Sequence, residues 1–121
     1  MEFSNYLNAG YPLLWVSTPE EDRAIEDLMS QAEGFNCYRW DIAGGIRSCF
    51  GDKFSQDIED PISALNYIMS LEEDSVIFMF DFHKFFQDIT TIRACKNLIK
   101  AMKATSRHIV FIAPTVEIPV D

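Results

Sequence analysis

The stretch that decides the fold is Ser75-Val-Ile-Phe-Met-Phe-Asp81, in which five apolar residues run without a break and end on a carboxylate. An apolar run without polar alternation predicts a strand buried on both faces, as in the middle of a parallel sheet. In such sheets, functional side chains tend to lie just beyond the carboxyl ends of the strands. Asp81 is therefore a candidate site residue, and the competing interpretation is that it only caps the next turn.

Three more strands are predicted around this one, at residues 12–17, 37–42 and 108–113. The 37–42 segment alternates more, so we expect it nearer an edge of the sheet. Helical patterns separate all four segments, and helical crossovers between apolar strands indicate a parallel sheet. The predicted fold class is α/β, a three-layer sandwich with a parallel sheet of about four strands. If the topology follows that of nucleotide-binding ATPases, the strand order is 2-3-4-1.

The first long helix is expected to follow the strand at residues 12–17. Thr18 is the predicted N-cap, Pro19 takes the first helical position, and Glu21 completes a capping box. Gly34 is the expected end of the helix. One apolar stripe is predicted along it, formed by Ala24, Ile25, Leu28, Met29 and Ala32.

Two later helices are predicted in the same way. Asp60-Pro61 repeats the cap-then-proline start, and the helix runs to about residue 71 with a stripe of Ile62, Leu65, Ile68 and Met69. The longest helix is expected at 88–105. Its buried face is predicted to comprise Ile92, Cys95, Ile99 and Met102.

The remaining segments are an arm, a connector and a tail. We expect a single domain over residues 1–121, with a short N-terminal helix or arm at 1–10. The connector at 43–59 shows no convincing period, and connectors of this length are often binding loops. Residues 114–121 read as an extended tail or linker that could pair at the edge of the first strand.

Charge and cysteine content exclude several classes of function. Nineteen acidic residues against ten basic residues give a net charge of −9, which argues against nucleic acid as a partner. The three cysteines form no CxxC pair, so neither a disulfide framework nor a metal site is expected, and a reducing, cytoplasmic setting is favoured. Without an 18-residue apolar run or a basic-then-apolar N-terminus, we expect no membrane partner and no signal peptide.

An apolar strand that ends on Asp81 also has the form of the Walker B element of P-loop NTPases. Such a protein needs a glycine-rich GxxxxGK[ST] loop after its first strand. Here that position reads Ser17-Thr-Pro-Glu-Glu-Asp22, in which three carboxylates would repel a triphosphate and proline removes an N–H donor. We therefore expect no nucleotide or other cofactor and no catalytic residue in this chain.

A different class remains open as the alternative, namely a small Mg²⁺-dependent phospho-switch or hydrolase. Asp81 with Glu20 or Glu21 could form an acidic group at the strand ends, as in response-regulator receivers. His83 follows Asp81 closely and could serve proton transfer, although a histidine that bonds locally at a strand end is the simpler interpretation.

Basic residues gather in one segment of the chain. They step by three and four residues along the last predicted helix and its end, at Arg93, Lys96, Lys100, Lys103 and Arg107. One interpretation is a solvated face with cations near a helix C-terminus. The other is a docking face for an acidic protein or for another copy of the chain.

Several segments resemble one family in order along nearly the whole chain. They are Tyr11-Pro-Leu-Leu-Trp-Val-Ser-Thr-Pro-Glu-Glu-Asp-Arg23, Trp40-Asp41 with Gly45, Asp60-Pro-Ile-Ser-Ala-Leu65, Asp81-Phe-His83, and Ile109-Val-Phe-Ile-Ala-Pro114 with Ile118-Pro119. Together they are similar to the N-terminal region of the AAA-type ATPases of the plastid and cyanobacterial kind.

The resemblance implies a degenerate nucleotide-binding fold without its phosphate loop, followed in the family by a complete AAA module. It implies a non-catalytic regulatory or protein-interaction role, with ATP hydrolysis in that following module. Its implied partners are the AAA module, other copies of the chain or an acidic protein. The implied location is the cytoplasm or the plastid stroma.

Overall fold

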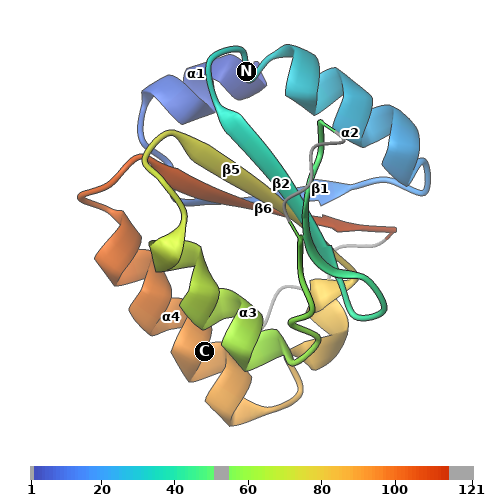
Figure 1. The fold of residues 1–121 in the computed structure, drawn as a ribbon, viewed down its shortest axis with the longest axis vertical. Helices are drawn as coiled ribbons and strands as arrows, with labels where there is room; N and C mark the ends of the chain where they lie inside the picture. The colour runs from blue at the N-terminus through green and yellow to red at the C-terminus, as the bar shows by residue number, and fades with distance from the viewer. Residues whose placement is uncertain (1, 51–54, 115–121) are drawn as a thin grey trace.

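The computed structural model describes residues 2–50 and 55–114, which form a central sheet between two layers of helices (Figure 1). In chain order the elements are α1 (Phe3–Asn8), β1 (Leu13–Ser17), α2 (Glu21–Ser30), β2 (Asn36–Asp41), β3 (Gly45–Ser48), β4 (Ser55–Gln56), α3 (Pro61–Tyr67), the 3-10 helix η1 (Ile68–Ser70), β5 (Ser75–Phe80), the 3-10 helix η2 (Phe82–Phe85), α4 (Ile89–Met102) and β6 (Arg107–Ala113).

The sheet confirms the predicted α/β class and strand order. Its order is β1-β6-β5-β2-β3-β4, and the first four of these strands are parallel. Taking only the four predicted strands, β2-β5-β6-β1 is the expected 2-3-4-1 order. Ile77 of β5 pairs with Ile109 of β6, and Ile109 pairs in turn with Leu13 of β1.

The connector at 43–59 contains two strands that were not predicted, which also corrects the expected position of β2. β3 and β4 continue the sheet in antiparallel fashion beyond β2, so β2 is an interior strand. Gly45 opens β3 with a φ of +70°, and a Cβ there would overlap the carbonyl oxygen of Gln56. Only glycine allows β4 to come this close.

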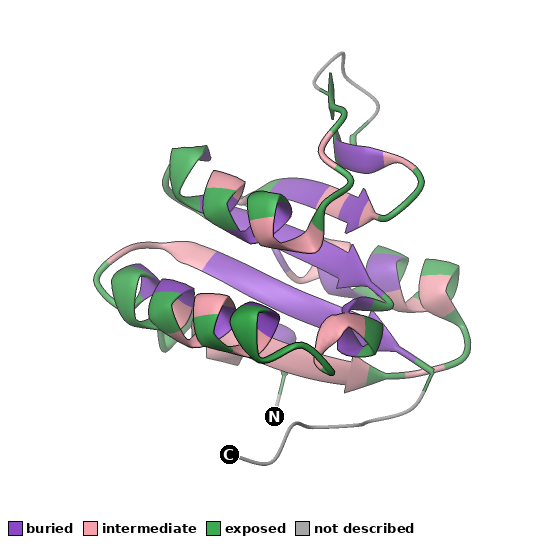
Figure 2. Ribbon diagram, turned by 90° about the horizontal axis from the view of Figure 1, so that it is seen from below, coloured by how far each residue is buried: buried purple, intermediate pink, exposed green. Residues whose placement is uncertain are grey.

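β5 and β6 supply both cores because their side chains alternate between the two faces. On the α1 and α2 side, the strand residues Val76, Phe78, Phe80, Val110 and Ile112 are buried. On the α3 and α4 side, the buried strand residues are Ile77, Met79, Ile109 and Phe111. Figure 2 shows this buried strand core between exposed helix surfaces. The unbroken apolar run of the sequence follows directly from burial on both faces.

The start of α2 differs from the prediction. The helix begins at Glu21, so neither Thr18 nor Pro19 has its expected position, and the N-cap residue Glu20 makes no side-chain cap bond. The Thr18 N–H donates to the Ala113 carbonyl (2.8 Å), which extends the sheet and delays the helix. The end also moves, because α2 stops at Ser30 and Gly34 lies in the later turn with a φ of +89°.

The other two long helices start as predicted. The Asp60 side chain accepts the Ser63 N–H (2.9 Å), and Pro61 is the first residue of α3. In α3–η1 the predicted stripe residue Met69 is exposed, whereas Ala64 is buried. Asp88 caps α4 through the Thr90 N–H (3.2 Å), and the fully buried positions of α4 are Thr91, Cys95, Leu98 and Met102.

Arg107 is not on the basic face of a helix, as the sequence had suggested. It is the first residue of β6, and its side chain is only 14% exposed. Its Nε donates to the Leu71 carbonyl (2.8 Å), and one terminal nitrogen lies 3.5 Å from a Glu73 carboxylate oxygen. The three- and four-residue spacing of the basic residues continues in the sequence past Met102, but the helix ends there, so the spacing gave the wrong position for Arg107.

The predicted tail lies outside the described residues from 115 onward. α1 occupies most of the predicted arm and packs Phe3 and Leu7 into the core on the α2 side. Within the described residues, no helix is long and apolar enough to span a bilayer.

Candidate functional site

The four parallel strands end at one edge of the sheet, and the predicted acidic residues follow those ends. The connection after β1 is only three residues long, from Thr18 to Glu20. The Thr18 hydroxyl accepts the Glu20 N–H (3.1 Å), so this turn uses its own hydroxyl and one of its few donors internally. A phosphate loop would need a longer, glycine-rich backbone with its N–H groups aimed at the ligand.

Asp81 lies directly beyond β5 in a left-handed conformation, with φ 58° and ψ 21°. Aspartate tolerates this conformation better than most residues do. Its N–H donates to the Ile112 carbonyl (3.1 Å), and its own carbonyl accepts the Lys84 N–H (3.2 Å). The backbone therefore holds this turn, and the residue itself is exposed.

Glu21 is the residue whose pKa is raised by partial burial and by the negatively charged groups at the strand ends. Partial burial raises the pKa of its carboxyl above the ordinary value, and the negative charges of Asp81, Asp22 and Asp41 raise it further. The positive charge of Arg39 acts in the opposite direction. We call Glu21, Asp22, Asp41 and Asp81 the strand-end carboxylates. They come from three connections of the sheet, and the three aspartates act together on the Glu21 carboxyl.

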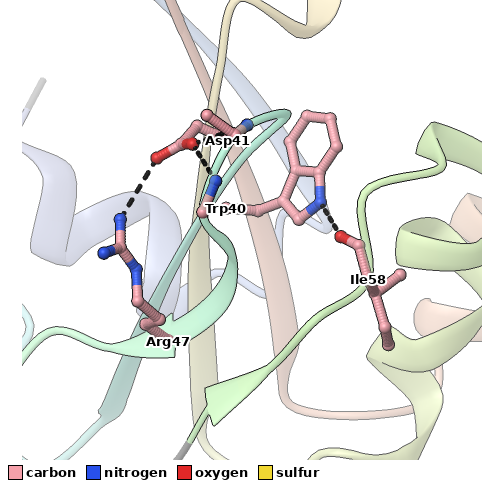
Figure 3. A network of polar contacts seen from close by, with 6 residues as sticks. Trp40, Asp41, Arg47 and Ile58 are labelled. Carbon is pink, nitrogen blue, oxygen red and sulfur yellow. Dashed lines mark hydrogen bonds and ion pairs between the residues drawn. The ribbon is translucent and has the colours of Figure 1, made fainter.

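Asp41 was not predicted as part of this group. Asp41 is the last residue of β2, and Asp81 directly follows β5. This similar position after a strand is the sequence signal that could have identified Asp41. Its carboxylate accepts the Ala43 N–H (3.0 Å) and the Gly44 N–H (2.6 Å), and it pairs with Arg47 (3.3 Å; Figure 3). Beside it, Trp40 Nε1 donates to the Ile58 carbonyl (2.8 Å), which fastens the end of the connector to β2.

Arg39 was also missed, because nothing in its local sequence distinguishes it. Its guanidinium carbon lies 4.8 Å from the ring centroid of Phe80. Its Nε is buried and has no hydrogen-bond partner among the described residues. The arginine thus lies on the α2 side of the sheet, where its charge partly offsets the strand-end carboxylates.

The four residues predicted at the strand ends have different surroundings. Asp81 is close enough to raise the pKa of the Glu21 carboxyl, whereas Glu20 is exposed and pairs with Arg23 (3.5 Å). His83 is buried in η2, and neither ring nitrogen has a partner within the part of the chain that the structure describes. In that part, no three His, Cys, Asp or Glu side chains form a group that could hold a metal ion.

A second candidate surface runs along the outside of α4. We define the α4 face as Ile89, Arg93, Lys96, Lys100 and Lys103. Arg93, Lys100 and Lys103 are exposed and make no ion pair with any described residue. Ile89 is 79% exposed at the start of the helix, beside a shallow hollow of about 450 Å³ that Arg93 and Asn97 also line.

Together, the strand order, the aspartate beyond β5 and the three-residue turn define an α/β domain of nucleotide-binding ATPase topology with no phosphate loop after β1. The chain belongs to the family of SpoVK-like AAA ATPase N-terminal domains, which it matches over residues 1–121.

Curated relatives agree with this membership. The chain is 32% identical over 99% of its length to the AAA domain-containing protein ycf46 of Guillardia theta, and 31% identical over 93% to that of Pyropia yezoensis. A third relative, from Trieres chinensis, is 29% identical over 93% of the chain. The chain spans about a quarter (24%) of the length of each of these relatives. No solved structure matches it.

Proposed function

We propose that this chain is a non-catalytic regulatory and protein-interaction domain of an AAA-type ATPase, whose ATP hydrolysis resides in a following module. Family membership and the 24% coverage of the ycf46 relatives support this division of labour. A domain of this kind needs a surface for protein partners and has no need of a nucleotide site of its own.

The observation that carries the proposal is the group of strand-end carboxylates. In open α/β folds, ligands bind at the carboxyl ends of the strands, and a phosphate there is held by loop N–H groups. Here that place carries four carboxylates, and the three-residue turn offers few donors. Both charge and backbone therefore oppose a triphosphate.

The partner surface is the α4 face. It is a cationic strip on a chain whose net charge is −9, so its sign selects for acidic surfaces. Its residues Arg93, Lys100 and Lys103 are exposed, which suits steering and specificity more than stability. Exposed helix charges contribute only a few tenths of a kcal/mol each to folding.

Calorimetric titration with Mg²⁺-ATP tests the first half of the proposal. We expect no saturable binding at a Kd of roughly 100 µM or tighter, which corresponds to about 5.5 kcal/mol. The double variant Glu21→Gln with Asp81→Asn removes two of the charges and should also fail to bind, because the turn still lacks donors. Saturable binding by the unmodified chain would overturn the proposal.

A ten-residue glutamate peptide tests the second half as a generic acidic probe. We expect weak binding by fluorescence anisotropy that falls as salt rises, since exposed charges are screened over about 10 Å at 0.1 M. Lys100→Glu with Lys103→Glu should abolish it. Arg23→Glu with Lys84→Glu is the matched control, because both residues are exposed outside the α4 face and the change in net charge is the same. Equal loss in the control would show that only net charge matters.

A further inference from the structure

The two helical layers carry opposite charge. Residues 20–33, which include α2, hold six carboxylates and one arginine, a net charge of −5. Residues 89–103, which include α4, hold four cations and no carboxylate, a net charge of +4. α2 and α4 lie on opposite faces of the sheet (Figure 1), so each copy of the domain presents one surface of each sign.

Next to α2 there is a groove of about 400 Å³ between α1, β1 and α2. We call it the α2 groove. Its apolar lining includes Leu14, Val16 and Leu28, and Asp27 and Gln31 line it on the helix side. Among the strands that the structure describes, β1 lies at one end of the sheet. The α2 groove is a recess of mixed polarity, in which apolar side chains lie beside two carboxylates, Glu2 and Asp27.

The α4 face carries the complementary features. Ile89 is the most exposed of the large apolar residues that the structure describes. Arg93 follows four residues later, so its side chain lies on the same side of the helix one turn along. The apolar side chain of Ile89 could fill the recess of the α2 groove, while the cation of Arg93 would lie opposite the Asp27 carboxylate at its border.

We propose that the partner of the α4 face is a second copy of this chain. Ile89 of one copy enters the α2 groove of the next, and Arg93 and Lys100 oppose Asp27 and Glu26. This inference rests on the proposed function and identifies the acidic surface that the α4 face binds. Because the two surfaces differ, the contact is head-to-tail and can repeat into a ring or an open chain.

Sedimentation velocity of the intact chain at rising concentration tests the contact. We expect association at 50 mM salt that weakens at least tenfold at 500 mM, where exposed charges are screened within a few ångströms. Ile89→Ser should leave the chain monomeric at either salt concentration. Met69→Ser is the control, an exposed apolar side chain in η1 outside the α4 face, and it should associate like the unmodified chain.

A charge exchange makes the test specific to the two surfaces. The first variant, Arg93→Glu with Lys100→Glu, makes the α4 face acidic; the second, Glu26→Lys with Asp27→Lys, makes the α2 side basic. Each variant alone should be monomeric, and an equimolar mixture should associate as the unmodified chain does. A mixture that stays monomeric overturns the pairing of these surfaces.

The glutamate peptide separates this inference from the proposed function. An unmodified chain that is monomeric up to about 1 mM but binds the peptide through α4 overturns self-association and leaves the proposed function standing. A chain that does neither overturns both.

Discussion

Alanine substitutions at Gly45 and Gly34 measure how much stability depends on the close packing of β4 against the start of β3. Both residues have positive φ, +70° and +89°. An alanine Cβ at Gly34 would meet nothing within 4 Å. At Gly45 it would overlap the Gln56 carbonyl oxygen and lie 3.0 Å from the Ile58 nitrogen. The two substitutions therefore share the backbone strain and differ in the clash.

The expected magnitudes follow from these two terms. A non-glycine residue in the left-handed region costs about 1–2 kcal/mol, which is the expected effect of Gly34→Ala. Overpacking against a backbone that cannot move aside costs about 1–3 kcal/mol more. Gly45→Ala should therefore lower the free energy of unfolding by roughly 2–5 kcal/mol, a large part of the typical 5–15 kcal/mol.

Urea unfolding followed by far-UV circular dichroism measures both variants, and an unchanged slope with denaturant shows that the same surface is exposed. Trp40 provides a local reading, because its Nε1 bonds to the Ile58 carbonyl beside the clash. Its fluorescence should change in folded Gly45→Ala and not in Gly34→Ala. If both variants lose the same stability, the close approach of β4 to Gly45 is wrong.

Three further predictions concern caps, charge and thiols. Asp60→Ala should cost about 1 kcal/mol in thermal unfolding, because it removes the cap of α3, whereas Glu20→Ala removes no cap bond and should cost little. The raised pKa of Glu21 means that its ionised form destabilises the fold, fully so above the folded-state pKa and not at all well below the ordinary 4.5. Glu21→Gln should therefore stabilise at pH 7 and lose that gain near pH 3, unlike the exposed control Glu26→Gln, in urea titrations at both pH values. Burial raises the thiol pKa to about 11 for Cys37, about 12 for Cys49 and about 11 for Cys95. Labelling by a disulfide reagent at pH 8 should therefore be slow until urea is added. Rapid labelling of the folded chain would contradict this.

Local signals were sufficient to predict the parallel half of the sheet. The run from Val76 to Phe80 is apolar because both faces of β5 are covered, and that pattern appears in the sequence without any knowledge of its neighbours. The predicted cap at Asp60 is equally local, since its side chain accepts an N–H three residues ahead. The cap at Asp88 was not predicted, although it accepts an N–H only two residues ahead. The prediction that Asp81 and Glu21 lie at the same edge of the sheet used the rule that parallel strands end at one edge.

The features that were missed depend on contacts between distant residues. β3 and β4 have four and two residues, too few to show a period. Their places are set by the pairing of β3 with β2, by the pairing of β4 with β3, and by the Trp40–Ile58 bond. Thr18 was expected to cap a helix, but the Ala113 carbonyl, 95 positions away, takes its N–H into the sheet. Arg39 became visible as part of the site only through its approach to Phe80 and the carboxylates.

The pairing of β1 with β6 has a consequence for how this chain is made. Among the described strands, β1 is the first to be synthesised and its neighbour is the last, β6, with Leu13 opposite Ile109. At about 5–20 residues per second, the ribosome needs roughly 5–20 s to add the intervening segment. During that interval the apolar residues of β1, Leu13 to Val16, have no strand of their own to pair with. A nascent chain that stalls before residue 107 would keep that segment exposed, so a release or cleavage at that stage should yield an aggregating fragment, while one after residue 113 should not.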